Sequence, residues 1–250
     1  MVVIRDDARI ARLKKVSQYL SLIGMFALIA GMILAFVGDL QSVFFWQMMA
    51  LLVGWLFSQV GIYLAHRYTR SPRPDEVLDE AFRKVARNGR MYHYILPAPH
   101  VLLLPTGIIV INAKYQTGKI TANGEKWTQK GLGARRFFGQ ENLGNPTKEV
   151  DAMVQNVINF IHKEVPEAEE IPIAPLIVFT TKGLDTLDVD NSDIPAMHYT
   201  KVKGFMRQQR QQGAEKPMDE PVYQAIRAAL DKKAAKILEG QPAIANETGK

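Results

Sequence analysis

A long stretch almost free of charge most constrains what this chain can fold into. Residues 19–65 contain one charged side chain, Asp39, and the rest of the 250-residue chain holds the other 55 Asp, Glu, Lys and Arg residues. The stretch divides into two apolar runs, 20–38 and 43–65. About 20 helical residues cross the hydrocarbon core of a bilayer, which is roughly 30 Å thick. The sequence therefore predicts a transmembrane helical hairpin at 19–65, with the lipid bilayer as its partner.

Other classes of protein fit this pattern less well. A purely soluble protein of this size has too little chain to cover two uncharged helices, and two spans are too few for a polytopic transporter. The first run is longer than the 7–15 apolar residues of a cleaved signal peptide, and a second run follows at once. The hydrophobic content of 47% excludes an intrinsically disordered chain, and the absence of cysteine excludes a disulfide-stapled secreted fold.

The charges that flank the spans predict the orientation of the hairpin. Of the net charge of +6, residues 1–18 carry +3 and residues 66–74 carry +3, whereas the connector 39–42 has no positive charge. Positive flanks stay on the cytoplasmic side. We therefore expect a two-span protein of the cell membrane with both termini in the cytoplasm. Neither run contains an ionisable residue, so the hairpin is interpreted as an anchor and not as an ion path.

The remaining chain predicts one cytoplasmic α/β domain. We expect a basic N-terminal segment at 1–18, a basic proline-containing linker at 66–74, the domain at 75–240 and a flexible tail at 241–250. Apolar periodicity predicts helices at 75–86 and 219–238, and a third helix after the Asn145-Pro146 start signal. Short apolar runs predict a hairpin of strands at 101–104 and 108–111, a strand at 119–121, and a buried strand at 173–180 that is parallel if the third helix is its crossover.

Several landmarks of the domain resemble the NERD (nuclease-related) domain family. They are HVLLLPTGIIVINAK at 100–114, the following YQTGKI at 115–120, Trp127, and the Asn145-Pro146 helix start. The resemblance covers roughly residues 75–180. It implies a core similar to that of the PD-(D/E)XK nucleases, in which two acidic groups hold a divalent cation and a lysine positions or activates the attacking water.

The chain departs from the family pattern where that chemistry takes place. Pro99 and Asn112 occupy the two positions where the family has acidic residues, whereas Lys114 is present and Glu76 or Glu80 supplies a helix acid. Magnesium sites in proteins usually include one or two carboxylates. The resemblance therefore implies a degenerate site in a domain that binds or scaffolds, without a metal or other cofactor.

Two other functions stay open from the sequence. The first is an active magnesium-dependent nuclease whose acids have moved, with Glu125 or Glu141 as replacements. The second is a membrane-complex partner or homo-oligomer that acts through the hairpin, since small residues repeat every four positions at Ala27, Gly31 and Ala35 and at Gly54 and Ser58.

The charge balance within the domain points to a possible anion-binding surface. Residues 75–150 carry a net charge of +4 and residues 151–250 carry −3. This places a surface for nucleic acid or another anionic ligand on the region 114–148, with Lys119, Arg135 and Arg136 as candidate ligand-binding residues. Alternatively, residues 130–144 form a loop whose aromatic side chains pack inward.

Overall fold

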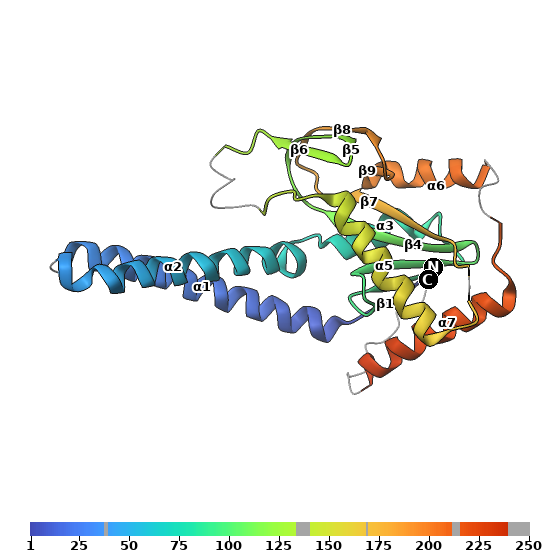
Figure 1. Cartoon of the computed structure of the whole chain (residues 1–250), viewed down its shortest axis with the longest axis horizontal. Helices are drawn as coiled ribbons and strands as arrows, with labels where there is room; N and C mark the ends of the chain where they lie inside the picture. The colour runs from blue at the N-terminus through green and yellow to red at the C-terminus, as the bar shows by residue number, and fades with distance from the viewer. Residues whose placement is uncertain (38–39, 134–140, 169, 212–215, 240–250) are drawn as a thin grey trace. The chain divides into compact units, whose positions relative to one another are not determined.

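The computed structural model describes residues 1–250 except 38–39, 134–140, 169, 212–215 and 240–250 (Figure 1). The chain divides into two compact units. The first unit comprises Met1–Ala8, Asp75–Lys130 and Leu143–Lys250, and the second comprises Arg9–Pro74 and Gly131–Asn142.

Most of the second unit is a pair of long apolar helices. α1 (Asp7–Val37) and α2 (Leu40–Leu64) contain most of the two predicted spans, and a π-helical turn, η1 (Ala65–Thr69), follows α2. By length and composition both helices are able to cross a membrane. Large apolar side chains are exposed along both of them, among them Phe26, Phe36, Trp46 and Leu52. Such exposure is unusual for a water-soluble surface.

Small residues let the two helices pack closely. A Cβ atom on Gly24 would lie 2.8 Å from the backbone N of Ser58, and one on Gly54 would lie 2.9 Å from the backbone N of Leu28. The Ser17 hydroxyl donates a hydrogen bond of 3.0 Å to the Gly61 carbonyl oxygen. The predicted pair of small residues, Gly54 and Ser58, therefore lies in the contact between α1 and α2 of the same chain.

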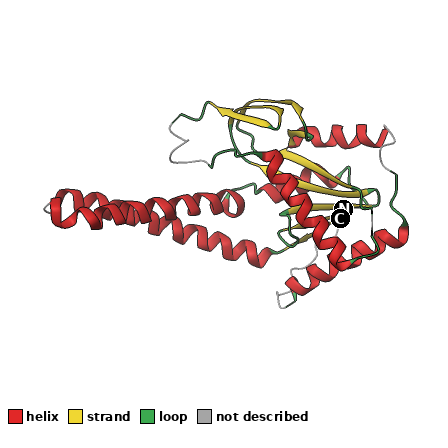
Figure 2. Ribbon diagram, in the orientation of Figure 1, coloured by secondary structure: helices red, strands yellow, loops and turns green. Residues whose placement is uncertain are grey.

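The first unit is built on a six-stranded mixed sheet of order β1-β2-β3-β4-β7-β9, seen in yellow in Figure 2. Its strands are β1 (Val2–Arg5), β2 (Arg90–His93), β3 (His100–Leu104), β4 (Gly107–Lys114), β7 (Ile173–Phe179) and β9 (Ala196–His198). The helices are α3 (Pro74–Arg83), α5 (Pro146–Glu164), α6 (Val202–Gln211) and α7 (Glu220–Leu238), with a 3₁₀ turn, η2 (Tyr199–Lys201), before α6. β3 and β4 form the predicted antiparallel hairpin, and β7 pairs parallel with β4 after the α5 crossover, as predicted.

A smaller sheet of order β6-β5-β8 completes the unit. It consists of β5 (Gly118–Gly124), β6 (Lys126–Lys130) and β8 (Leu184–Ser192). Ile120, Ala122 and Val189 are buried and belong to the same core cluster as α5 and α7. The sequence prediction contained only part of β5 and missed both of its partners.

The two faces of the large sheet carry separate cores. One core joins the sheet to α5 and α7 and contains Val101, Leu103 and Val110, whereas the other joins it to α3 and contains Leu102 and Ile111. Alternate residues of a strand point to opposite faces. A position on β3 or β4 is thereby assigned to the α5 face or to the α3 face by its parity.

The N-terminal strand is the main difference from the sequence prediction. Residues 1–18 were expected to form a separate basic segment, but β1 pairs parallel with β2 at the edge of the sheet. Arg5 forms ion pairs with Asp75, at 3.0 Å, and with Asp79, and both carboxylates lie on α3. A four-residue strand that pairs across a long insertion has no local periodic signal to reveal it.

The C-terminal helix is tied to the same edge strand pair. Asp231 on α7 accepts hydrogen bonds from the Tyr92 hydroxyl, at 2.7 Å, and from Arg90, at 2.8 Å. Burial, together with the Asp231 hydrogen bond, raises the pKa of Tyr92 above its usual range. The phenol therefore stays protonated and continues to donate to Asp231 at neutral pH.

The close contact of the hairpin helices generates a first prediction. Gly54→Ala places a Cβ against the backbone of Leu28, so the helices must separate, and we expect a loss of about 1–3 kcal/mol in stability. Thermal unfolding of the detergent-solubilised chain measures the change. Ile33→Ala, at an exposed position of α1, is the matched control and is expected to stay within about 0.5 kcal/mol. Equal effects of the two substitutions would contradict the close packing.

Candidate functional site

The two site residues of β4 point to the α5 face of the sheet. Asn112 and Lys114 have the same parity as Val110, which packs in the α5 core. Both are buried, Asn112 at 4% and Lys114 at 6% relative exposure. The interior of a protein disfavours an amide or an ammonium group without partners. Their hydrogen bonds therefore decide what this part of the sheet can do.

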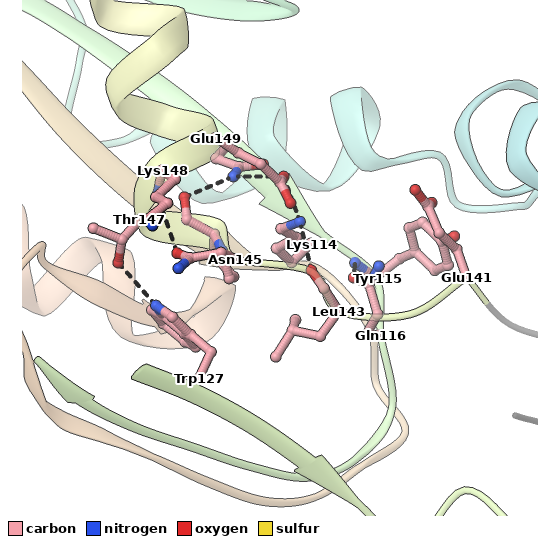
Figure 3. A network of polar contacts seen from close by, with 12 residues as sticks. Lys114, Tyr115, Gln116, Trp127, Glu141, Leu143, Asn145, Thr147, Lys148 and Glu149 are labelled. Atoms are coloured by element: carbon pink, nitrogen blue, oxygen red, sulfur yellow. Dashed lines mark hydrogen bonds and ion pairs between the residues drawn. The ribbon is translucent and has the colours of Figure 1, made fainter. Parts of the chain in front are cut away.

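Both side chains meet Glu149, which lies in the first turn of α5. Figure 3 shows Lys114 beside Glu149. Lys114 Nζ lies 2.5 Å from Glu149 Oε2 and donates a second bond of 3.0 Å to the Leu143 carbonyl oxygen. Asn112 Nδ2 lies 3.2 Å from the same Glu149 oxygen and 3.2 Å from the Pro146 carbonyl oxygen. One carboxylate thus accepts from a lysine and from an amide, and the group as a whole has no net charge.

Local structure holds Glu149 in this place. Asn145 caps α5 by accepting a 3.1 Å hydrogen bond from the Lys148 backbone N, and Pro146 begins the helix. A carboxylate in the first turn is stabilised by the positive end of the helix dipole. Gly144 has a φ of 68°, and a Cβ there would lie 2.7 Å from Glu149 Oε1. Glycine at 144 therefore allows both the turn and the position of the carboxylate.

The smaller sheet braces the start of α5 from its other side. Trp127 on β6 donates from Nε1 to the Thr147 hydroxyl at 2.8 Å, as Figure 3 shows. Gln129 accepts a 3.1 Å hydrogen bond from the Leu143 backbone N and donates to the Thr117 carbonyl oxygen at 2.9 Å. The hydrogen bond to Gln129 holds Leu143 in place, and the Leu143 carbonyl oxygen accepts the hydrogen bond from Lys114.

The predicted helix acids lie elsewhere. Glu76 and Glu80 are on α3, which packs against the opposite face of the sheet through Leu78 and Phe82. Glu76 is partly exposed and Glu80 is exposed. Pro99 directly precedes β3, and its carbonyl oxygen accepts from the Tyr94 backbone N at 2.8 Å. The structure therefore brings Asn112 and Lys114 together but does not bring the α3 acids to them.

Each of the two acids considered as replacements has contacts with other residues. Glu125 is exposed in the turn between β5 and β6, where its backbone carbonyl oxygen accepts from Asn145 Nδ2 at 3.2 Å. Glu141 belongs to the second unit and pairs with Arg67 at 2.9 Å. Sequence reasoning missed Glu149, although its position four residues after the Asn145 cap marks it as a first-turn acid beside the buried Val150.

The candidate anion-binding residues are only partly described. Lys119 is exposed on β5, directly opposite Lys130 of β6. Arg135 and Arg136 lie outside the described residues. The structure therefore supplies two neighbouring lysines to the expected surface on 114–148, and that surface stays a prediction.

A second polar cluster lies on the α3 face, where the sequence gave no signal for a site. His93 and His100 are both buried, with their Nδ1 atoms 2.8 Å apart, and His93 Nε2 lies 3.0 Å from Asp79. A neutral His93 that donates from Nε2 to an ionised Asp79 has an unprotonated Nδ1, which accepts from His100. The cluster continues from Asp79 to Arg5 and links β1 to the sheet.

The residues beside Lys114 do not fit a divalent cation. Within the described residues, no three His, Asp or Glu side chains are grouped so that they could hold a metal ion. Glu149 is a carboxylate that Lys114 and Asn112 both contact, and the lysine already neutralises it. Magnesium prefers several hard oxygen ligands, and a neutral amide paired with an ammonium group is a poor substitute.

Comparison with known proteins agrees with the resemblance seen in the sequence. Residues 81–180 match the model of the NERD family, described as the nuclease-related domain. No curated protein and no solved structure gives a significant match to the chain. The matched segment runs from α3 to the end of β7 and contains Asn112, Lys114 and Glu149.

The unequal burial of the Lys114–Glu149 pair generates a second prediction. The side chain of Lys114 is 8% exposed and that of Glu149 is 39% exposed. Glu149→Gln leaves a buried ammonium group without its carboxylate and is expected to cost about 2 kcal/mol. Lys114→Met leaves a carboxylate that reaches water and is expected to cost less than about 1 kcal/mol. Denaturant unfolding of the detergent-solubilised chain measures both.

Lys119→Met serves as the control for this prediction, because Lys119 is exposed. This substitution is expected to change the stability by less than about 0.5 kcal/mol. A larger loss for Lys114→Met than for Glu149→Gln would contradict the proposed balance of the pair.

Proposed function

We propose, from the premise that residues 81–180 form a nuclease-related domain, that this chain is a membrane-anchored binding or scaffolding protein without nuclease activity. Its ligand is expected to be anionic and to meet the 114–148 region. The hairpin at 19–65 holds the domain at the membrane surface. The α/β domain faces the cytoplasm in this proposal.

One observation is the main support for the proposed lack of nuclease activity. The lysine that a nuclease of this kind needs near water and metal is instead paired to Glu149 at 2.5 Å, with Asn112 on the same carboxylate oxygen. To position a water molecule, Lys114 would have to leave its carboxylate while its own ammonium group stays buried, which costs about 2 kcal/mol. The three groups satisfy each other, which favours a structural role.

Glu149 is also the one observation in favour of an active enzyme. It places a carboxylate at the site although both expected acidic positions are occupied by other residues. In that alternative, Glu149 is the relocated acid and binds magnesium after releasing Lys114. We favour the inactive form, because one carboxylate is fewer than the two that the family resemblance implies.

The strand order supports the proposed topology. β1 precedes the hairpin in the chain, β2 follows it, and the two are hydrogen-bonded neighbours in one sheet. A sheet cannot continue through a bilayer, so a hairpin that crosses the membrane returns the chain to the side from which it started. The positive flanks then favour the cytoplasm as that side.

A nuclease assay tests the first part of the proposal. The full chain in detergent is incubated with single- or double-stranded DNA and with Mg²⁺ or Mn²⁺, beside Lys114→Met and Glu149→Gln. We expect all three proteins to show the same background, because the wild-type site lacks a second carboxylate. Cleavage that requires the metal and disappears in either variant would establish the active alternative. The full chain is used because a fragment from residue 75 lacks β1.

Cysteine labelling tests the topology, since the natural chain contains no cysteine. Ser42→Cys lies between the two predicted spans, near the start of α2, whereas Lys14→Cys lies before the first span and Lys126→Cys lies in the domain. An impermeant maleimide applied to intact cells is expected to label Ser42→Cys alone, and the other two only after permeabilisation. Labelling of Lys14→Cys and Lys126→Cys from opposite sides would contradict the proposed arrangement.

A further inference from the structure

The outward side of α2 presents a continuous apolar stripe. Phe45, Met48, Leu52 and Trp55 are each at least 50% exposed, and they follow one another at spacings of three, four and three residues. Gln59 comes four residues later and is partly exposed. Residues with an average spacing of 3.5 stay on one side of a helix that packs against another in a left-handed supercoil, so they form a continuous contact line. We call these five residues the α2 seam.

The seam does not belong to the contact with α1. That contact uses Gly54 and Gly61, where a Cβ would lie less than 3 Å from atoms of Leu28 and Ser21. At 100° per residue, these glycines lie on the opposite side of α2 from Leu52 and Gln59. The hairpin is therefore packed by one side of α2, and the seam remains on the other side.

Two polar groups of the seam have no hydrogen-bond partner within the described residues: the Gln59 amide and the Trp55 indole N–H. Trp55 is eight residues from Tyr63 and nine from Trp46, which places it about 12–14 Å from each of these aromatic residues and near the middle of a bilayer. Tryptophan is enriched at the membrane surface, and not at this depth. Lipid tails offer neither group a hydrogen bond, whereas a neighbouring helix does.

We propose that the α2 seam is the contact surface for a second copy of this chain. The amide of glutamine both donates and accepts, so Gln59 pairs with Gln59 of an identical helix across a two-fold axis. Two copies inserted in the same orientation place equivalent residues opposite each other, as a parallel seam requires. The Trp55 rings and the flanking apolar side chains then pack at the centre of the contact. This inference rests on the proposed insertion of the hairpin in the membrane.

Disulfide crosslinking in membranes tests the dimer. Leu52→Cys introduces a single thiol in the seam of the full, otherwise cysteine-free chain. Val60→Cys introduces one on the same helix, exposed but about 80° away from Leu52. After oxidation of isolated membranes, we expect covalent dimers from Leu52→Cys and at least tenfold fewer from Val60→Cys. Equal yields at the two positions would overturn the proposal.

Two further substitutions in the Leu52→Cys chain test the role of the amide. Gln59→Leu removes the hydrogen-bonding group and keeps an apolar side chain, so dimers are expected to fall about 3- to 30-fold. Gln47→Leu is the matched control. Gln47 is also a glutamine of α2, but it lies about 120° around the helix from Gln59 and outside the α2 seam. Unchanged dimers in Gln59→Leu, or an equal fall in Gln47→Leu, would overturn the proposal.

The membrane fraction separates this inference from the anchor itself. If the chain stays in carbonate-washed membranes but Leu52→Cys gives no covalent dimers, the proposed dimer is contradicted and the anchor is not. A chain recovered in the soluble fraction contradicts the anchor as well as the dimer.

Discussion

The parallel pairing of β1 with β2 is the constraint on which the rest of the structure depends. It joins residues from before the helical hairpin to residues that follow it, so the hairpin is an insertion in the domain and not an attached leader. Arg5 stabilises this pairing through its ion pairs with Asp75 and Asp79. Asp79 also contacts His93, which is paired with the buried His100. Because one sheet contains both flanks, the two ends of a membrane-spanning hairpin share one side of the bilayer.

The polar cluster at the start of α5 is the basis of the proposal that the nuclease-related domain has lost its nuclease chemistry. β4 and the start of α5 still bring a lysine, an amide and a carboxylate together in a buried place. Ion pairs of this kind contribute little net stability, but removal of one partner is costly, which preserves the arrangement. In the proposed function, such a site has a structural role, and the domain binds an anionic ligand through the surface around Lys119.

Much of the fold was predictable from local signals. The hairpin of β3 and β4, the Asn145-Pro146 start of α5 and the parallel β7 all follow from apolar periodicity and from capping residues. β1, β2, β6, β8 and β9 were missed. β1, β8 and β9 pair with strands that are far away in the chain, and the short β2 and β6 contain several polar residues, so none of the five has a clear apolar pattern. For the site, Asn112 and Lys114 were identified from the family resemblance. Glu149 was missed, since the side of α5 that meets β4 is decided by tertiary packing.

Manganese binding tests the central claim, the self-neutralised site at Lys114, most directly. Mn²⁺ scatters anomalously, so crystals of the full chain soaked in Mn²⁺ reveal any ion bound near Lys114. We predict that Lys114 stays paired with Glu149 and that no manganese peak lies within ligand distance of Glu149. A manganese ion coordinated by Glu149 and the Asn112 oxygen, with Lys114 displaced from the carboxylate, would contradict the account.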